Sequence, residues 1–232
     1  EAAAIPGVAI PLLQDDCINT TVDLDWVWDL LHLTSDDKTY RLDLDSLKTT
    51  VRNWFDTASL DTIMGTIAAG DETAQIARTY LKNGGKRWRP YLAACTYMAL
   101  ESDRQDSEPT LTAEVKKAAI AIECFHKASL IHDDIEDGDD TRYDSPALHA
   151  EVGVAVALNI GDFLIGEGYR LLGELGNGEL TRIAAHGHVT LSRGQGRELI
   201  WARDPQPLPS MQVLEIFRQK TAAAFEVALR MG

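Results

Sequence analysis

Apolar residues recur at spacings of three and four along most of this chain, which is the period of an amphipathic α-helix. In residues 113–132 the apolar stripe begins at Val115 and Ala119, and Thr112 can cap the helix that it predicts. The same pattern predicts further helices over residues 60–82, 90–101, 150–174, 180–203 and 211–231. Strand-like alternation is scarce, so we expect one all-α domain of long packed helices.

Turn-forming residues and a change in regularity divide the chain. An Asn-Gly-Gly stretch at 83–85 separates two of the predicted helices, and the proline-rich segment 204–210 ends another. The first forty or so residues have the least periodic pattern. We therefore expect residues 1–55 to form an N-terminal extension of uncertain role, and residues 56–232 to form the main helical domain.

The composition narrows the class of partner. The 232 residues carry a formal net charge of -14, from 36 acidic and 22 basic side chains. Repulsion from phosphates then argues against nucleic acid and anionic membrane surfaces. No apolar run reaches about 18 residues, the length that suggests a membrane span, and the N-terminus lacks the basic region of a signal peptide. We expect a cytoplasmic protein with no transmembrane segment.

An acidic run at residues 132–149 is the strongest sign of chemistry. It holds seven carboxylates and a single arginine, Arg142, so a cation among them would offset their mutual repulsion. If the preceding helix continues through the run, Asp133, Asp134 and Asp137 can converge on one face. Hard oxygen ligands of this kind suit Mg²⁺. The simpler alternative is a solvated acidic loop.

A basic cluster lies immediately before the helix predicted at residues 90–101. Three cations, Lys86, Arg87 and Arg89, stand beside the flexible pair Gly84-Gly85. Lysine supplies a point charge and arginine a forked set of donors, so the cluster suits phosphate groups. Taken alone, such a cluster is more often a solvated surface loop.

The motifs follow one another in a characteristic order. The chain contains GGKRWRP, then ECFHKASLIHDDIED, TRYDSPALH, NIGD, GQGREL and KTA. From about Leu81 to the C-terminus, this succession resembles the trans-isoprenyl diphosphate (polyprenyl) synthase family. The resemblance implies an all-α fold around a central cavity, a homodimer and dependence on Mg²⁺. It also implies the condensation of an allylic diphosphate with isopentenyl diphosphate.

The resemblance also implies roles for individual residues. Asp133 and Asp137 would ligate Mg²⁺, with Asp134 supporting the site. The other site residues divide between the two diphosphates. Those implied for the allylic diphosphate are Arg142 and Lys220, with Thr221 near the reacting carbon. Those implied for isopentenyl diphosphate are Lys86, Arg89 and His126. Gln195 matches the family's glycine–glutamine motif and is implied to bind substrate.

Two departures from the family pattern bear on function. The family usually has two adjacent arginines where this chain has Arg142-Tyr143, and the second normally helps to bind isopentenyl diphosphate. Weaker or altered acceptor binding is therefore expected. The sequence also ends at Gly232, before the family's second aspartate-rich motif. We accordingly expect a domain that is incomplete at its C-terminus and lacks the last helices of the bundle.

The residues before the first aspartates predict the length of the product. In the family, the floor of the product cavity is set there. Ala128 and Ser129 are both small in this chain and leave the cavity open, so Phe125 is the expected floor. A product of C20 or longer is therefore favoured.

Two other functions remain open. A class I terpene cyclase or lyase on the same fold needs no isopentenyl diphosphate, which suits Tyr143, although GGKRWRP argues against it. A non-catalytic regulatory subunit of a heteromeric prenyl synthase would explain the missing second motif, although the intact aspartates argue against that alternative.

Overall fold

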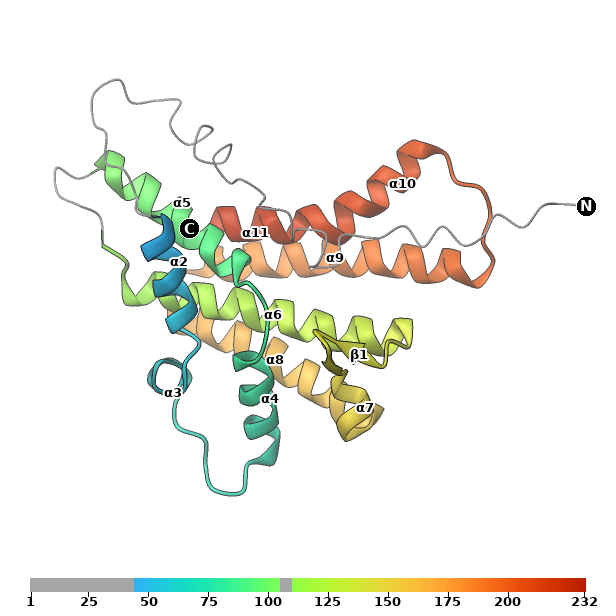
Figure 1. Ribbon diagram of the computed structural model, residues 1–232. Coiled ribbons are helices and arrows are strands. Elements are labelled where there is room, and N and C mark those ends of the chain that lie inside the picture. Colours follow the sequence, from blue (N-terminus) through green and yellow to red (C-terminus); the bar gives the residue numbers. More distant parts are fainter. Residues whose placement is uncertain (1–43, 105–109) are drawn as a thin grey trace, which may run out of the picture. The chain divides into compact units, whose positions relative to one another are not determined.

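The computed structural model describes residues 44–104 and 110–232 (Figure 1). These residues belong to one compact unit. Helix α2 (Leu44–Asn53) packs against helix α5 (Trp88–Arg104) within it, so the predicted boundary between residues 55 and 56 falls inside this unit. Most of the predicted N-terminal extension, residues 1–43, lies outside the described residues.

The described residues are almost entirely helical, which confirms the all-α prediction. One long helix lies between α5 and a small antiparallel hairpin in the chain. None of the described helices is long and apolar enough to cross a membrane. The remaining elements are α3 (Thr57–Met64), α4 (Glu72–Lys82), α6 (Ala113–Asp137), β1 (Thr141–Arg142), β2 (Ser145–Pro146), α7 (Leu148–Val152), α8 (Val154–Glu174), α9 (Gly178–Arg203), α10 (Ser210–Phe217), the π-helical turn η2 (Arg218–Ala222) and α11 (Ala223–Met231).

The prediction of a single helix over residues 60–82 is wrong. The chain turns between α3 and α4, where Gly65 and Gly70 have positive φ values of 87° and 84°. Asp71 then caps α4, because its side chain accepts a hydrogen bond from the backbone N–H of Ala74 at 2.9 Å. Apolar spacing alone misses this break, because apolar residues continue through it.

Other predicted helices are right in place but differ in extent. Helix α6 continues to Asp137 and ends at Gly138, which takes a left-handed conformation with a φ of 71°. The helix predicted over 150–174 is divided at Gly153, whose φ is 83°. The helix predicted over 211–231 is interrupted by η2.

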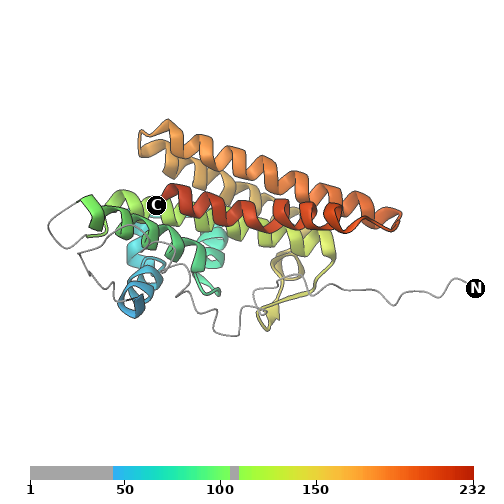
Figure 2. The same cartoon turned by 90° about the horizontal axis from the view of Figure 1, so that it is seen from above.

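Helix α6 lies among the other long helices (Figure 1, Figure 2). It packs along α8 and against α5, while α9 lies beside α8 and α11. Glycines on α8 allow the close approach to α6: Gly161 faces His132, and a Cβ added to Gly168 would lie 2.7 Å from the ring of Phe125. Any larger residue at these glycines would push the two helices apart.

Apolar burial between these helices supplies the core. Ile120 and Ile131 of α6 and Ile160, Leu164 and Leu171 of α8 have side chains that are essentially inaccessible to water, and the two helices pack against each other. Burying each such side chain contributes about 1.5–3 kcal/mol. The core therefore fixes the position of α6 from its middle to the start of the acidic run.

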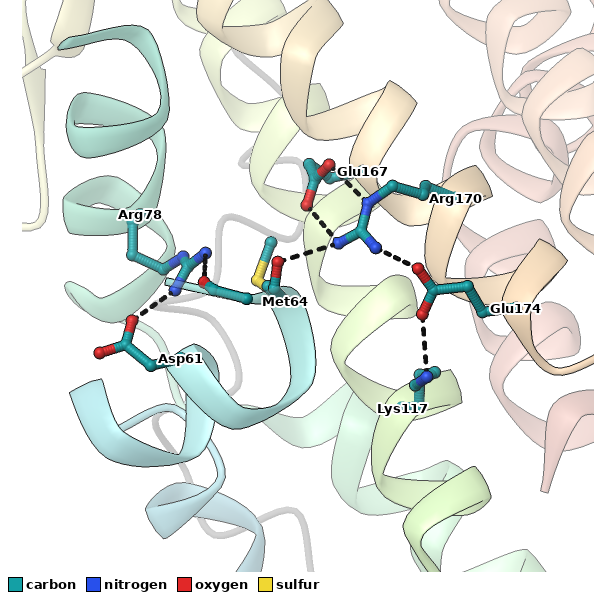
Figure 3. A network of polar contacts seen from close by, with 8 residues as sticks. Asp61, Met64, Arg78, Lys117, Glu167, Arg170 and Glu174 are labelled. Carbon is teal, nitrogen blue, oxygen red and sulfur yellow. Dashed lines mark hydrogen bonds and ion pairs between the residues drawn. The ribbon is translucent and has the colours of Figure 1, made fainter. Parts of the chain in front are cut away.

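An ion-pair network ties α8 to the helices before it (Figure 3). The guanidinium of Arg170 donates to Glu167 at 2.8 Å, to Glu174, and to the backbone carbonyl of Met64 at 3.3 Å. Glu174 in turn accepts from Lys117 of α6 at 2.9 Å. The same arginine thus satisfies an orphan carbonyl at the end of α3 and pairs with two carboxylates of its own helix.

Arg78 of α4 completes this arrangement from the other side (Figure 3). It donates to Asp61 at 2.9 Å and to the carbonyl of Gly65 at 3.2 Å, so it holds the turn after α3. Arg78 itself is buried. Its charge is therefore committed to the fold.

Candidate active site

The first site element is the acidic end of α6. The helix runs through the aspartates, so Asp133 and Asp137 lie one turn apart on the same face. Asp137 is exposed and Asp133 is partly buried. The negative end of the helix dipole lies at the same place, which favours a cation there.

Asp134 differs from the expectation that three aspartates converge. It is only 1% exposed, and its Oδ1 accepts a hydrogen bond from Arg142 Nε at 2.9 Å and pairs with Arg142 Nη2. Because 100° separates neighbouring side chains on a helix, Asp134 turns away from the face of Asp133. Its support for the site passes through Arg142 of β1.

Burial changes the acidity of the two carboxyls on the exposed face. It raises the pKa of Asp133 to about 7, with the charge of Lys220 opposing the shift and those of Glu136 and Asp137 adding to it. Burial also raises the pKa of Asp137, again opposed by Lys220. Burial therefore disfavours the ionised form of both carboxyls, and a nearby cation would favour it.

The second site element is η2, which carries Lys220 and Thr221. A Cβ added to Gly194 of α9 would lie 2.7 Å from the backbone nitrogen of Lys220, so only glycine lets η2 approach α9 this closely. Lys220 forms an ion pair with Glu198 of α9. Single π-helical turns are frequent at functional sites because they re-aim one side chain.

Gln195 connects α9 with the acidic end of α6. Its Nε2 donates to Glu136 Oε2 at 2.7 Å. Sequence reasoning missed Glu136 and the partnership of Lys220 with Glu198. Glu136 lies three residues after Asp133, so its place on the same side of α6 was readable from helical spacing.

The third site element is the basic loop, defined as residues 83–89, whose last two residues are the first two of α5. Arg89 donates to His126 Nε2 at 2.8 Å, and its guanidinium lies 4.0 Å from the ring centroid of Trp88. Lys86 is exposed. The structure thus brings together Arg89 and His126, which the sequence assigned to the same diphosphate.

Arg87 has a different position from its basic neighbours. It is 5% exposed and donates to Glu123 at 2.5 Å and to the carbonyls of Leu81 and Lys82 at 2.6 and 2.8 Å. It therefore satisfies the last carbonyls of α4, which would otherwise be orphaned. The sequence grouped Arg87 with its basic neighbours, and nothing local to it distinguishes their roles.

A buried lysine lies beneath the same loop. Lys127 of α6 is 1% exposed and donates to the carbonyl of Asn83 at 2.7 Å. Its ammonium lies 5.3 Å from the ring centroid of Tyr80 and 5.4 Å from that of Tyr143. Sequence reasoning missed Lys127, although a lysine inside the apolar run of α6 was a visible signal.

The polyprenyl synthetase family matches residues 71–232, which include all three site elements. The chain belongs to the polyprenyl synthetase family. It is 31% identical to the short chain isoprenyl diphosphate synthase of Methanocaldococcus jannaschii over 167 residues, covering 70% of this chain and 48% of that protein. The resemblance inferred from the motifs is confirmed.

Solved structures agree with this assignment. The chain is similar to a geranyltranstransferase from Thermotoga maritima, with a TM-score of 0.65 and 25% identity over 80% of this chain and 65% of that one. It is similar to a polyprenyl synthase from Caulobacter crescentus solved with calcium and isoprenyl diphosphate, with a TM-score of 0.64 and 25% identity. That match covers 81% of this chain and 56% of the other. The chain spans about half the length of the curated relatives it matches.

The carboxylates at the acidic end of α6 are consistent with Mg²⁺. Within residues 44–104 and 110–232, no three His, Cys, Asp or Glu side chains are grouped closely enough to hold a metal by themselves. Mg²⁺ typically takes one or two carboxylates and keeps its remaining positions for water and substrate phosphates. Asp133 and Asp137, with raised pKa values on an open face, are a donor set of that kind.

Phe125, the expected floor of the product cavity, lies between α6 and α8. Its ring meets Tyr169 edge-on, with 4.8 Å between ring centroids, and rests on Gly168. The hydroxyl of Tyr169 lies 3.3 Å from Nδ1 of His188 on α9. Burial lowers the pKa of His188, so its ring favours the neutral form. Phe125 thus belongs to an aromatic and polar cluster about two turns below Asp133.

Proposed function

We propose that this chain is part of a Mg²⁺-dependent prenyltransferase. It would condense an allylic diphosphate with isopentenyl diphosphate and release a longer trans-polyprenyl diphosphate. The observation that carries the proposal is that Asp133 and Asp137 lie one turn apart at the acidic end of α6, where the charge of Lys220 from η2 acts on both carboxyls. Membership of the polyprenyl synthetase family supports the reaction class.

The donor half of the reaction would take place at the acidic end of α6. Asp133 and Asp137 would hold Mg²⁺, which supplies positive charge to stabilise the departing diphosphate. Lys220 pairs with Glu198 in the structure. It would exchange this partner for the same diphosphate. Arg142 would bind it with the donors that Asp134 does not occupy, and Thr221 would lie near the reacting carbon.

The acceptor half would take place at the basic loop. Lys86 and Arg89 would bind the diphosphate of isopentenyl diphosphate, together with His126. The hydrogen bond from Arg89 to His126 orients both side chains before substrate arrives. Gln195 would stay with Glu136 and hold α9 close to the aspartates.

Phe125 supports a product of C20 or longer. Ala128, which is fully buried, and Ser129, which is exposed, both have small side chains. Neither would block the space between Phe125 and Asp133. If Phe125 is the floor, Phe125→Ala lengthens the product distribution by one or more isoprene units in a chromatographic assay. Products of unchanged length would exclude Phe125 as the gate.

The proposal also includes a homodimer, which the family resemblance implies, and the cytoplasmic location expected from the sequence. Val154 and Leu158 stand one turn apart on α8 and are about half exposed, at 53% and 47%. A second copy covering them would bury an apolar stripe. Sedimentation velocity at several concentrations tests this, and a monomer throughout would refute the dimer.

Labelled isopentenyl diphosphate, an allylic primer and Mg²⁺ test the reaction with the purified protein. Chain elongation supports prenyl transfer. Cyclised hydrocarbon without incorporation of label would instead show a class I terpene cyclase, which Tyr143 favours because a cyclase needs no acceptor diphosphate. Absence of any product from a full-length protein would favour a non-catalytic subunit of a heteromeric synthase.

A further inference from the structure

The β1–β2 hairpin touches the basic loop and so joins the two halves of the proposed site. A Cβ added to Gly84 would lie 3.0 Å from Cδ2 and 3.3 Å from Cε2 of Tyr143, which means that the ring packs directly on glycine backbone. The preceding residue, Arg142, pairs with Asp134. Two successive side chains of the hairpin therefore contact different halves of the site.

Both partners in this contact have unusual backbones. Among the described residues, the non-glycine positions with positive φ are Arg87, Tyr143 and Asp144, at 58°, 53° and 60°. Two of them form the hairpin turn, and the third lies in the basic loop beyond Gly84 and Gly85, at 65° and 86°. Such conformations persist only where surrounding contacts hold them, and they gather at binding and catalytic sites.

The geometry of the turn does not by itself favour a tyrosine at position 143. A two-residue hairpin turn with positive φ at both positions is best served by Asn-Gly or Asp-Gly. Here Tyr143 and Asp144 occupy it, which is locally unfavourable. The ring, 37% exposed, lies on Gly84 with the ammonium of Lys127 nearby. Its position is thus explained by contact with the basic loop.

Contacts fix the basic loop at three points. Lys127 holds its beginning through the carbonyl of Asn83, and Arg87 holds its end through Glu123. Tyr143 packs on the middle. Lys86 is exposed and lies between Gly84, on which Tyr143 packs, and Arg87. Removing the ring would free the glycine pair directly before Lys86.

We propose that Tyr143 is a positioning residue for the acceptor diphosphate. Its ring holds Gly84 so that Lys86 and Arg89 present their charges in one arrangement. The inference rests on the proposed function, which assigns those two cations to isopentenyl diphosphate. The ring acts by packing rather than by charge, so it sets acceptor affinity and leaves the pair of Arg142 with Asp134 intact.

Substitutions at Tyr143 test this by calorimetry with isopentenyl diphosphate and by steady-state kinetics. Tyr143→Ala weakens acceptor binding and raises the acceptor KM about tenfold, the equivalent of one good polar contact, with kcat and the allylic KM little changed. Tyr143→Phe keeps the ring and restores acceptor affinity. Equal effects of Ala and Phe, or no effect of Ala, would overturn the proposal.

Asp144→Asn is the matched control, because asparagine tolerates positive φ and the ring at 143 remains. It leaves acceptor affinity unchanged, whereas a loss equal to that of Tyr143→Ala would show that the whole turn matters and the ring does not. Gly84→Ala perturbs the same contact from the loop side and also weakens acceptor binding. It therefore carries the test if Tyr143→Ala fails to fold, and unchanged affinity would overturn the proposal.

Binding and turnover separate this inference from the proposed function. A full-length wild-type protein that binds isopentenyl diphosphate but transfers no prenyl group refutes the proposed reaction, and the Tyr143 comparison still holds. An active wild type with unaltered acceptor affinity in Tyr143→Ala refutes the positioning role alone. A wild type that binds no isopentenyl diphosphate refutes both.

Discussion

Charged side chains serve opposite purposes in two regions of this molecule. In the network of Figure 3, Arg170 meets two glutamates and a backbone carbonyl, so opposite charges offset one another. At the C-terminal end of α6, Asp133 and Asp137 lie together where the helix dipole is also negative, and burial raises the pKa of both. The first region stabilises the fold by itself. The second costs stability until a cation binds.

The same contrast divides residues that are neighbours in sequence. Arg87 is buried with Glu123 and the end of α4, whereas Lys86 is exposed and Arg89 meets His126. One cation of the basic loop therefore holds the loop, and the other two are those proposed to bind the acceptor diphosphate. The role of each charged residue therefore follows from the group that it contacts and not from its position in the motif.

The largest effect should come from the acidic end of α6. Asp133→Ala should reduce prenyl transfer by at least about a hundredfold. It removes a proposed ligand of Mg²⁺, the ion whose charge would stabilise the leaving diphosphate. Incorporation of labelled isopentenyl diphosphate measures the loss. Asp139→Ala, an exposed carboxylate of the same acidic run, is the control and should remain active. Near-normal turnover of Asp133→Ala would remove the metal-site assignment.

The buried pair beneath the basic loop should give the largest effect on folding. Glu123→Ala leaves Arg87 buried without its carboxylate, which should cost about 3–5 kcal/mol of unfolding free energy. Urea denaturation measures it. The matched control is Glu179→Ala, which breaks an exposed pair with Arg182 and should change stability little. Equal losses would contradict the contrast between buried and exposed pairs.

The network of Figure 3 should show a smaller cost. Arg170→Met keeps the apolar stem of the side chain but removes the guanidinium, so we expect a loss of about 1 kcal/mol because the group is partly exposed. Thermal unfolding in low and high salt measures it, and salt should narrow the difference between wild type and variant. A salt-independent loss would indicate packing rather than charge.

A different kind of test lies in the pH dependence of the stability of the metal-free protein. The pKa of Asp133 is raised to about 7 in the folded protein, from an ordinary value near 3.8. The folded state then binds more protons than the unfolded state between these values, so this group lowers stability as pH rises from about 4 to 7. Asp133→Asn should therefore unfold at a higher temperature than wild type at pH 8, and the gap should close toward pH 4. Added Mg²⁺ should stabilise wild type and not the variant.

Local patterns predicted much of the fold and supplied the candidate site residues. Thr112 caps α6, accepting from the N–H of Val115 at 3.3 Å, and the apolar stripe of α6 lies in the core, as periodicity predicts. The turn between α3 and α4 was missed because apolar spacing continues through it. The aspartates were found because they concentrate charge within a few residues, a feature that needs no tertiary information.

Long-range partners could not be predicted in the same way. Asp134 was expected beside Asp133, but its burial against Arg142 depends on how the β1–β2 hairpin folds back on α6. Lys127 meets the carbonyl of Asn83 across 44 positions in the chain. Tyr143 was read as a missing charge, and its contact with Gly84 depends on two loops that meet only in the folded chain.

The sequence by itself determined the helices, the family and the residue types available for chemistry, because helical periodicity and clustered charge act over a few residues. Only the tertiary structure decided which charges are consumed by the fold and which remain for a ligand. The physical reason is that the energy of a charge depends on its burial and its partner, and both are set by packing between distant segments. Asp133 and Asp134 are neighbours in sequence, yet packing leaves Asp133 only partly buried and buries Asp134 against Arg142.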